Sequence, residues 1–267
     1  MSWRADERGY TPAERWTVRF EDGTSAFVKA AATEMTAAWL QQESFIYNAA
    51  EGDFLPRVLA WEDGERPMLV LEDLSQAVWP PPWSPSLVGR VLEMLSEVRS
   101  TEPPGGLPSL DRLSLRGWSI VAENPTSFLG LGLCSSEWLD EALPALVTAE
   151  LEAPLEGEEF VHLDLRSDNL CFTGERTLMV DWNLACRGNG LFDIAAWLPS
   201  LQSEGGPVPE EVSEDASVFA GIVSGYFAAR AGEPIIVEAP RVRGVQLAQL
   251  RTALSWAVRA LDLPPVR

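Results

Sequence analysis

Polar side chains suited to phosphoryl transfer gather between residues 162 and 181. Asp164 follows an apolar run, Asn169 comes five residues later, and Asp181 ends a second apolar run. Phosphoryl transfer needs a carboxylate that orients the attacking hydroxyl, and it needs oxygen ligands for a magnesium ion that bridges the phosphates. This order of residues predicts Asp164 as the catalytic carboxylate and Asn169 and Asp181 as magnesium ligands. Incidental positions in a surface loop or a structural hairpin are the alternatives.

Two basic side chains belong to the same stretch. Arg166 lies two residues after Asp164, and its positive charge could stabilise the γ-phosphoryl group in the transition state. A salt bridge to Asp168 is the alternative for this side chain. His162 is the only histidine of the chain, and a lone histidine on an apolar strand is more often a buried structural residue. We therefore predict a role beside the phosphate for Arg166 and a supporting role for His162.

Lys29 is the only lysine of the chain, since every other basic residue apart from His162 is an arginine. This usage suggests that a compact ammonium group is needed at this position. Lys29 lies in the middle of an expected strand, where a charge is costly unless it is paired. A lysine in that setting could bridge the α- and β-phosphates of a nucleotide and pair with a glutamate of the next helix. Glu43 is better placed than Glu34, and ordinary surface charges are the alternative.

A small lobe of mixed secondary structure is expected to carry this lysine. After a very short first strand, alternating apolar residues predict strands at 16–20, 26–30, 57–61 and 68–72, joined in pairs by tight turns. Apolar residues at helical spacing predict one helix over 33–50, which ends before Gly52. The lobe would span residues 1–74.

Helices dominate the rest of the sequence. Four prolines and two tryptophans interrupt any regular pattern between residues 75 and 85, which predicts a hinge and linker. Residues 86–267 would form a mostly helical lobe in which the stretch around 161–181 is the only strong strand signal. Its helices are expected at 86–100, 136–151 (kinked or broken at Pro144), 191–201, 210–231 and 241–261.

Composition excludes several classes of partner. The net charge of −20 argues against nucleic acid, whose phosphates require Lys and Arg, and no segment is apolar enough to span a membrane. The charge would suit a cationic substrate, although it could equally serve solubility. The N-terminus lacks a secretory signal, and the three cysteines have no metal-ligand spacing. A reduced, cytoplasmic protein is expected, with no prediction of its oligomeric state.

Four segments resemble the aminoglycoside phosphotransferase and choline kinase-like family, whose members share the protein-kinase fold. The most specific is His162-x-Asp164-x4-Asn169 followed by Asp181-Trp182. The others are the segments 188–195, 27–29 and 70–74. The resemblance implies an α+β, bilobal protein-kinase-like fold with a β-rich N-lobe and a mostly helical C-lobe. The sequence differs from protein kinases at Asn183, the position where protein kinases have glycine.

The resemblance also implies a nucleotide site and a reaction. Glu72, Asp73 and Leu74 would form the adenine-binding hinge, and the hydroxyl of Thr11 would contact phosphate in a loop with few glycines. The implied function is an ATP- and Mg²⁺-dependent transfer of the γ-phosphate to a hydroxyl of a small, cationic acceptor. An aminoglycoside or another cationic antibiotic, hence a role in antibiotic resistance, is the first expectation. Choline, homoserine, a sugar or a natural-product intermediate is the alternative acceptor, and a nucleotide-binding pseudokinase is the alternative from another class.

Overall fold

The computed structural model describes residues 2–5, 12–237 and 239–266, which divide into two compact units. The first unit comprises residues 1–108 and 158–187, and the second comprises 109–157 and 188–267. The first unit therefore joins the β-rich N-terminal part to the segment that carries Asp164 and Asp181. The lobe boundaries expected at residues 75–85 remain a prediction.

A five-stranded antiparallel sheet forms the N-terminal part of the first unit, in the order β1-β2-β3-β5-β4. Alternation of side chains along β5 buries Leu69 and Leu71 against the core, as period-2 patterning requires. The register places Lys29 directly opposite Arg15 on one side and Leu69 on the other. The predicted strands are confirmed, with bounds β1 Ser2–Ala5, β2 Glu14–Arg19, β3 Ser25–Ala30, β4 Val58–Glu62 and β5 Met68–Glu72.

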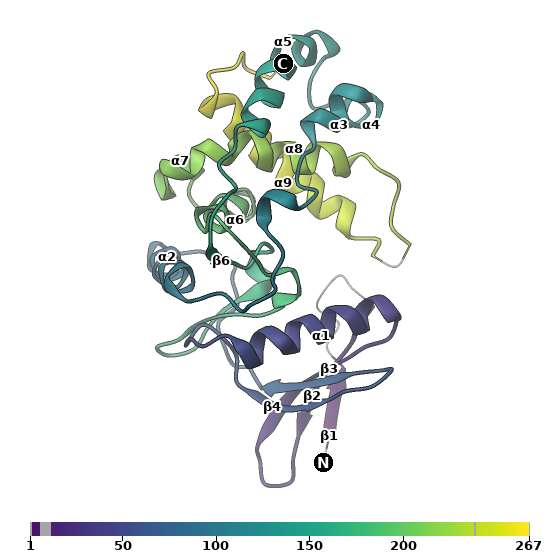
Figure 1. Ribbon diagram of the computed structural model, residues 1–267, viewed down its shortest axis with the longest axis vertical. Coiled ribbons are helices and arrows are strands. Elements are labelled where there is room, and N and C mark those ends of the chain that lie inside the picture. Colours follow the sequence, from purple (N-terminus) through teal and green to yellow (C-terminus); the bar gives the residue numbers. More distant parts are fainter. Residues whose placement is uncertain (1, 6–11, 238, 267) are drawn as a thin grey trace. The chain divides into compact units, whose positions relative to one another are not determined.

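Helix α1 (Glu34–Ala49) lies along one side of this sheet (Figure 1). Thr33 and Thr36 form a reciprocal capping box that satisfies backbone donors at its first turn. The helix ends at Ala49, in agreement with the sequence prediction. Its buried face includes Glu43 and Tyr47, which are four residues apart and hence neighbours on one face.

The remaining elements of the first unit build two small strand pairs beside a helix. Strand β6 (Glu159–Val161) pairs with β9 (Cys186–Gly188), and β7 (Leu170–Phe172) pairs with β8 (Thr177–Met179). Helix α2 spans Pro85–Ser100, and the 3-10 turns are η2 (Ser167–Asn169) and η3 (Trp182–Leu184). Trp182 is fully buried between the rings of Phe54 and Phe160. This packing anchors the chain immediately after Asp181.

Helices make up the second unit, and two expectations for it are corrected. Helix α5 is not broken at Pro144, because Trp138, Leu139 and Leu146 are buried on either side of the proline and hold both halves in place. The stretch 210–231 is not one helix, because the polar segment 213–215 offers no apolar face to bury. The elements are η1 Leu110–Arg112, α3 Trp118–Glu123, α4 Thr126–Leu129, α5 Ser136–Leu151, α6 Leu191–Ser203, α7 Pro209–Val212, η4 Asp215–Phe219, α8 Ala220–Ala231 and α9 Val242–Ala260. In the described part of the chain, no helix has the length and apolar character needed to cross a membrane.

A buried carboxylate holds three of these helices together. Glu150 of α5 is 1% exposed and accepts hydrogen bonds from the backbone N–H groups of Gly117, Trp118 and Ser119 at 2.6, 2.8 and 3.0 Å. These are the donors that open α3, so the carboxylate caps that helix. A Cβ on Gly225 of α8 would lie 2.4 Å from the Glu150 carboxylate, so only glycine allows α8 this close.

We expect Glu150→Gln to lower the free energy of unfolding by about 3 kcal/mol, because an amide cannot accept from all of these donors and leaves buried N–H groups unpaired. Urea denaturation measures the change. Glu152→Gln, at the exposed end of the same helix, is the matched control and should change stability by less than about 0.5 kcal/mol. Equal effects of the two variants would contradict the capping role.

Candidate active site

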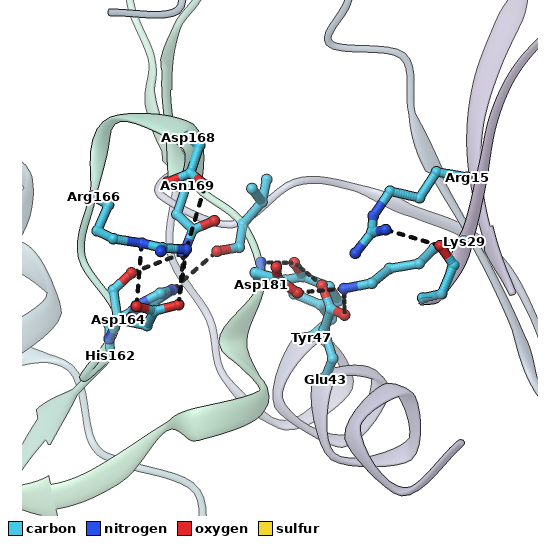
Figure 2. A network of polar contacts seen from close by, with 12 residues as sticks. Arg15, Lys29, Glu43, Tyr47, His162, Asp164, Arg166, Asp168, Asn169 and Asp181 are labelled. Carbon is cyan, nitrogen blue, oxygen red and sulfur yellow. Dashed lines mark hydrogen bonds and ion pairs between the residues drawn. The ribbon is translucent and has the colours of Figure 1, made fainter. Parts of the chain in front are cut away.

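Lys29 is nearly buried, at 9% exposure, and pairs with two carboxylates that come from distant parts of the chain. Its ammonium lies 2.6 Å from Glu43 Oε2 of α1 and also contacts Asp181 Oδ1 (Figure 2). Burial alone would lower the pKa of Lys29, but the charges of Asp181 and Glu43 outweigh burial and raise it. The lysine is therefore charged at neutral pH. The predicted pairing with Glu43 is confirmed, while the role of both residues toward nucleotide stays a prediction.

Asp181 occupies the turn between β8 and η3 with a left-handed backbone, φ 69°. Burial would raise the pKa of its carboxyl, but the adjacent Lys29 outweighs burial and lowers it, with a smaller contribution from the charge of Arg15. The carboxylate is consequently ionised and able to bind a cation. Its predicted role as a magnesium ligand fits this charge.

Sequence reasoning missed Arg15 and Tyr47, which complete this cluster. Figure 2 shows the guanidinium of Arg15 directed toward the Lys29–Asp181 pair, and Arg15 is the cross-strand partner of Lys29. The hydroxyl of Tyr47 donates to Glu43 Oε1 at 2.8 Å and accepts from the backbone N–H of Asp181 at 3.2 Å. The spacing of four residues from Glu43 was a signal for Tyr47, whereas Arg15 is recognisable only from the strand register.

His162 supports the loop that carries Asp164. The ring is fully buried, its Nε2 lies 3.0 Å from the carbonyl of Val180, and its Nδ1 accepts from the backbone N–H of Asp164 at 3.2 Å. Both bonds form together only in the neutral tautomer with hydrogen on Nε2. Leu163 between them has φ 72°, a strained conformation for a branched side chain, so the surrounding contacts must hold the loop in place.

Asp164 and Asn169 lie together, as the motif predicts. The Asn169 side-chain amide donates to the Asp164 backbone carbonyl at 2.8 Å and to its Oδ2 at 3.2 Å. These two hydrogen bonds direct the amide nitrogen of Asn169 toward Asp164. The amide oxygen therefore points away from the Asp164 carboxylate and is available to a cation. Asp164 is thus held in one orientation at the edge of the loop, with a third of its side chain exposed at 33%.

Arg166 forms ion pairs with both neighbouring carboxylates. Its Nε lies 3.3 Å from Asp164 Oδ1 and its Nη2 lies 3.3 Å from Asp168 Oδ2. The salt bridge to Asp168 therefore exists, and a role at the phosphate stays a prediction. Burial raises the pKa of Asp168, Arg166 opposes that rise, and the charge of Asp164 adds to it.

The expected hinge residues make structural contacts. The Glu72 carboxylate forms ion pairs with Arg57 and Arg176 at 3.2 and 3.0 Å, and although burial would raise its pKa these partners lower it. Asp73 accepts from the backbone N–H of Ser75 at 2.9 Å. The Leu74 carbonyl accepts from the Ala77 N–H and the Trp79 indole, each at 3.0 Å. Thr11 lies outside the described residues.

A magnesium ion fits the donor set without a protein cage. Among the residues that the structure describes, no group of three or more His, Cys, Asp or Glu side chains is disposed to hold a metal. Magnesium is commonly held by one or two carboxylates together with substrate phosphates and water. Asp181 and the amide oxygen of Asn169 match that requirement.

Comparisons with known proteins identify the family and the fold of this chain. Residues 3–233 match the model of the phosphotransferase enzyme family, whereas no curated protein matches the sequence. Among solved structures, a thermostable mutant of aminoglycoside phosphotransferase APH(4)-Ia is 13% identical, with 98% of this chain and 94% of that chain covered at a TM-score of 0.62. A further variant of that enzyme, in a ternary complex with ADP and hygromycin B, is 12% identical, with 98% of this chain and 93% of that chain covered at a TM-score of 0.59.

A choline/ethanolamine kinase family protein from Mesorhizobium loti is 12% identical, with 97% of this chain and 91% of that chain covered at a TM-score of 0.58. At these identities the likeness shows the fold. The predicted α+β, protein-kinase-like fold is confirmed.

Proposed function

Because this chain belongs to the phosphotransferase enzyme family, we propose that it transfers the γ-phosphoryl group of ATP to a hydroxyl of a small molecule in a Mg²⁺-dependent reaction. The observation that carries the proposal is the joining of Lys29 and Asp181 in one ion pair, with Asp164 and Asn169 on the adjoining loop. These are the four groups that the reaction needs.

Each group has a distinct task in this reaction. Lys29 binds the phosphates of the nucleotide, and Arg15 adds a second positive charge on the same face of the sheet. Asp181 and the amide oxygen of Asn169 would hold Mg²⁺, which supplies neutralising charge to the phosphates. Asp164 orients the acceptor hydroxyl and takes its proton, while Arg166 places positive charge beside the transferring group. A pseudokinase is disfavoured because all four groups are present.

We take a cationic small molecule as the acceptor. The net charge of −20 concentrates cations near the protein. Hygromycin B in one solved relative favours an aminoglycoside or another cationic antibiotic, and the choline/ethanolamine kinase likeness favours a small amino alcohol as the second candidate. ADP in that same relative supports ATP as the donor. The reaction would take place in the cytoplasm, where ATP is available and thiols stay reduced.

Phosphate transfer from γ-labelled ATP to a panel of acceptors tests the proposal. The panel contains aminoglycosides including hygromycin B, choline, ethanolamine, homoserine and sugars, each with Mg²⁺ and with a chelator in its place. We expect label on one chemical class of acceptor, and only when Mg²⁺ is present. The proposal fails if the enzyme binds no nucleotide, or if transfer proceeds equally well with the chelator.

A further inference from the structure

The Tyr47 hydroxyl lies between two groups of the phosphate site. It donates to Glu43 Oε1 and accepts from the backbone N–H of Asp181, while the second oxygen of Glu43 binds Lys29. Since Lys29 also contacts Asp181, the contacts close into a ring (Figure 2). The ring joins a strand, a helix and a turn that are far apart in the sequence. Of the four contacts in the ring, one joins Lys29 directly to Asp181, the proposed metal ligand. The other three connect the same two residues through Glu43 and Tyr47.

Packing alone does not explain a hydroxyl at this position. Tyr47 is 8% exposed, and a buried hydroxyl is costly unless it is hydrogen-bonded. Phenylalanine would fill the same space between α1 and η3 without that cost. The hydroxyl is fully used instead, since it donates one hydrogen bond to Glu43 Oε1 at 2.8 Å and accepts one from the Asp181 N–H at 3.2 Å.

The hydrogen bond to Asp181 acts on a strained residue. The left-handed backbone of Asp181 directs its N–H toward α1 and its carboxylate toward Lys29. Holding the N–H fixes the backbone of this turn and hence the position from which the carboxylate reaches Lys29. The bond to Glu43 likewise fixes the glutamate in the rotamer that reaches Lys29.

We propose that Tyr47 is a positioning residue for phosphoryl transfer, which sets the orientation of the metal ligand Asp181 and of the Lys29–Glu43 pair at the same time. The inference rests on the proposed function, since the consequences for metal and nucleotide require that reaction. Tyr47 itself touches neither the nucleotide nor the acceptor in this assignment.

Tyr47→Phe removes only the bridging hydroxyl, and Tyr226→Phe removes the same atom from a helix of the second unit. For Tyr47→Phe we expect about a tenfold lower kcat and about a tenfold weaker apparent affinity for Mg²⁺ in the presence of ADP, the size of one lost hydrogen bond. The Tyr226→Phe control should bind ADP and Mg²⁺ like the wild type. Both variants should unfold in one cooperative urea transition, which shows that the fold is intact.

Two further measurements report the bridge itself and need no substrate. Amide hydrogen exchange at Asp181 should become about tenfold faster in Tyr47→Phe. Selective ¹⁵N labelling of lysine gives a single side-chain signal, because Lys29 is the only lysine, and this signal should move in Tyr47→Phe and stay in place in Tyr226→Phe.

The outcomes separate the inference from the proposed function. If wild-type protein binds no nucleotide, the proposed function fails, whereas the exchange and lysine measurements still test the bridge. The inference is overturned if Tyr47→Phe keeps wild-type kcat and Mg²⁺ affinity within twofold. It is also overturned if stability falls while the Mg²⁺ dependence of turnover is unchanged, because Tyr47 would then serve folding alone.

Discussion

Replacing Asp164 with alanine is expected to lower kcat by about a thousandfold while MgATP binding changes by less than about threefold. Asn169 and Arg166 hold this carboxylate in one orientation, so it can align an acceptor hydroxyl and receive its proton without rearranging. The residue binds neither Mg²⁺ nor the nucleotide in the proposed arrangement, which is why binding survives. Steady-state kinetics with the identified acceptor and calorimetric titration with MgATP measure the two quantities separately.

Two companion variants make this first result interpretable. Asp164→Asn keeps the shape of the side chain and should lose nearly as much activity as alanine, because an amide cannot take the proton. Asp63→Asn, in an exposed turn of the sheet, makes the same chemical change away from the site and should leave kcat unaltered. If Asp164→Asn retained more than about a tenth of the wild-type kcat, proton transfer to this carboxylate would be excluded as a major contribution.

Replacing Lys29 with methionine is expected to lower the free energy of unfolding by about 3 to 5 kcal/mol and to abolish measurable nucleotide binding. Methionine fills a similar volume but leaves the buried carboxylate of Glu43 and the partly buried carboxylate of Asp181 without their shared counter-charge. Urea denaturation gives the stability, and titration with ADP gives the affinity. Arg66→Met is the control, because its ion pair with Glu14 is 3.7 Å long and exposed, and it should cost less than about 1 kcal/mol.

A second substitution tests whether the stability loss comes from uncompensated charge. Adding Glu43→Gln to Lys29→Met should recover part of the lost stability, since one buried carboxylate is then neutral. Additive losses in the double variant would contradict this explanation. The nucleotide affinity should not recover, because the ammonium group is still missing.

The free energies of unfolding of the wild type and the Lys29 variants are best compared at neutral pH, because the pKa shifts of Asp181 and Lys29 keep both groups charged there. The pKa of Asp181 is lowered from 3.8, so its contribution is complete above that value and is lost as the pH falls through the lower folded value. The pKa of Lys29 is raised from 10.5, so its contribution is complete below that value and is lost as the pH rises through the higher folded value. Between about pH 4 and 10 the stability from this pair should therefore be constant.

Local sequence patterns predicted most of the fold because they report burial directly. The strand at 68–72 was placed without error, since Leu69 and Leu71 alternate with half-exposed positions in a fully paired strand. The helices of the second unit were harder. Pro144 suggested a kink or break within α5, yet the helix runs unbroken through it because burial on both sides overrides the local preference of proline. The helices α3 and α4 were missed because six and four residues are too few to show a period.

The candidate site could be predicted where the chemistry requires a particular residue type at a fixed distance in sequence from another. Asp164 and Asn169 follow such a pattern, and the structure brings their side chains together. The contacts that support them join segments far apart in sequence, as in the bonds from Arg176 to Glu72 across 104 residues and from Asp181 to Tyr47 across 134. No local pattern encodes such pairs. Arg15 was missed for the same reason, because only the pairing of β2 with β3 makes it a neighbour of Lys29.

The discontinuity of the first unit has a consequence for how the protein is made. The ribosome releases residues 1–108 long before residues 158–187, and the intervening segment belongs to the other unit. Until the later stretch emerges, the nascent sheet lacks Asp181 as a partner for Lys29 and Arg176 as a partner for the carbonyl of Leu55. The proposed site therefore cannot be complete until residues 158–187 have been synthesised.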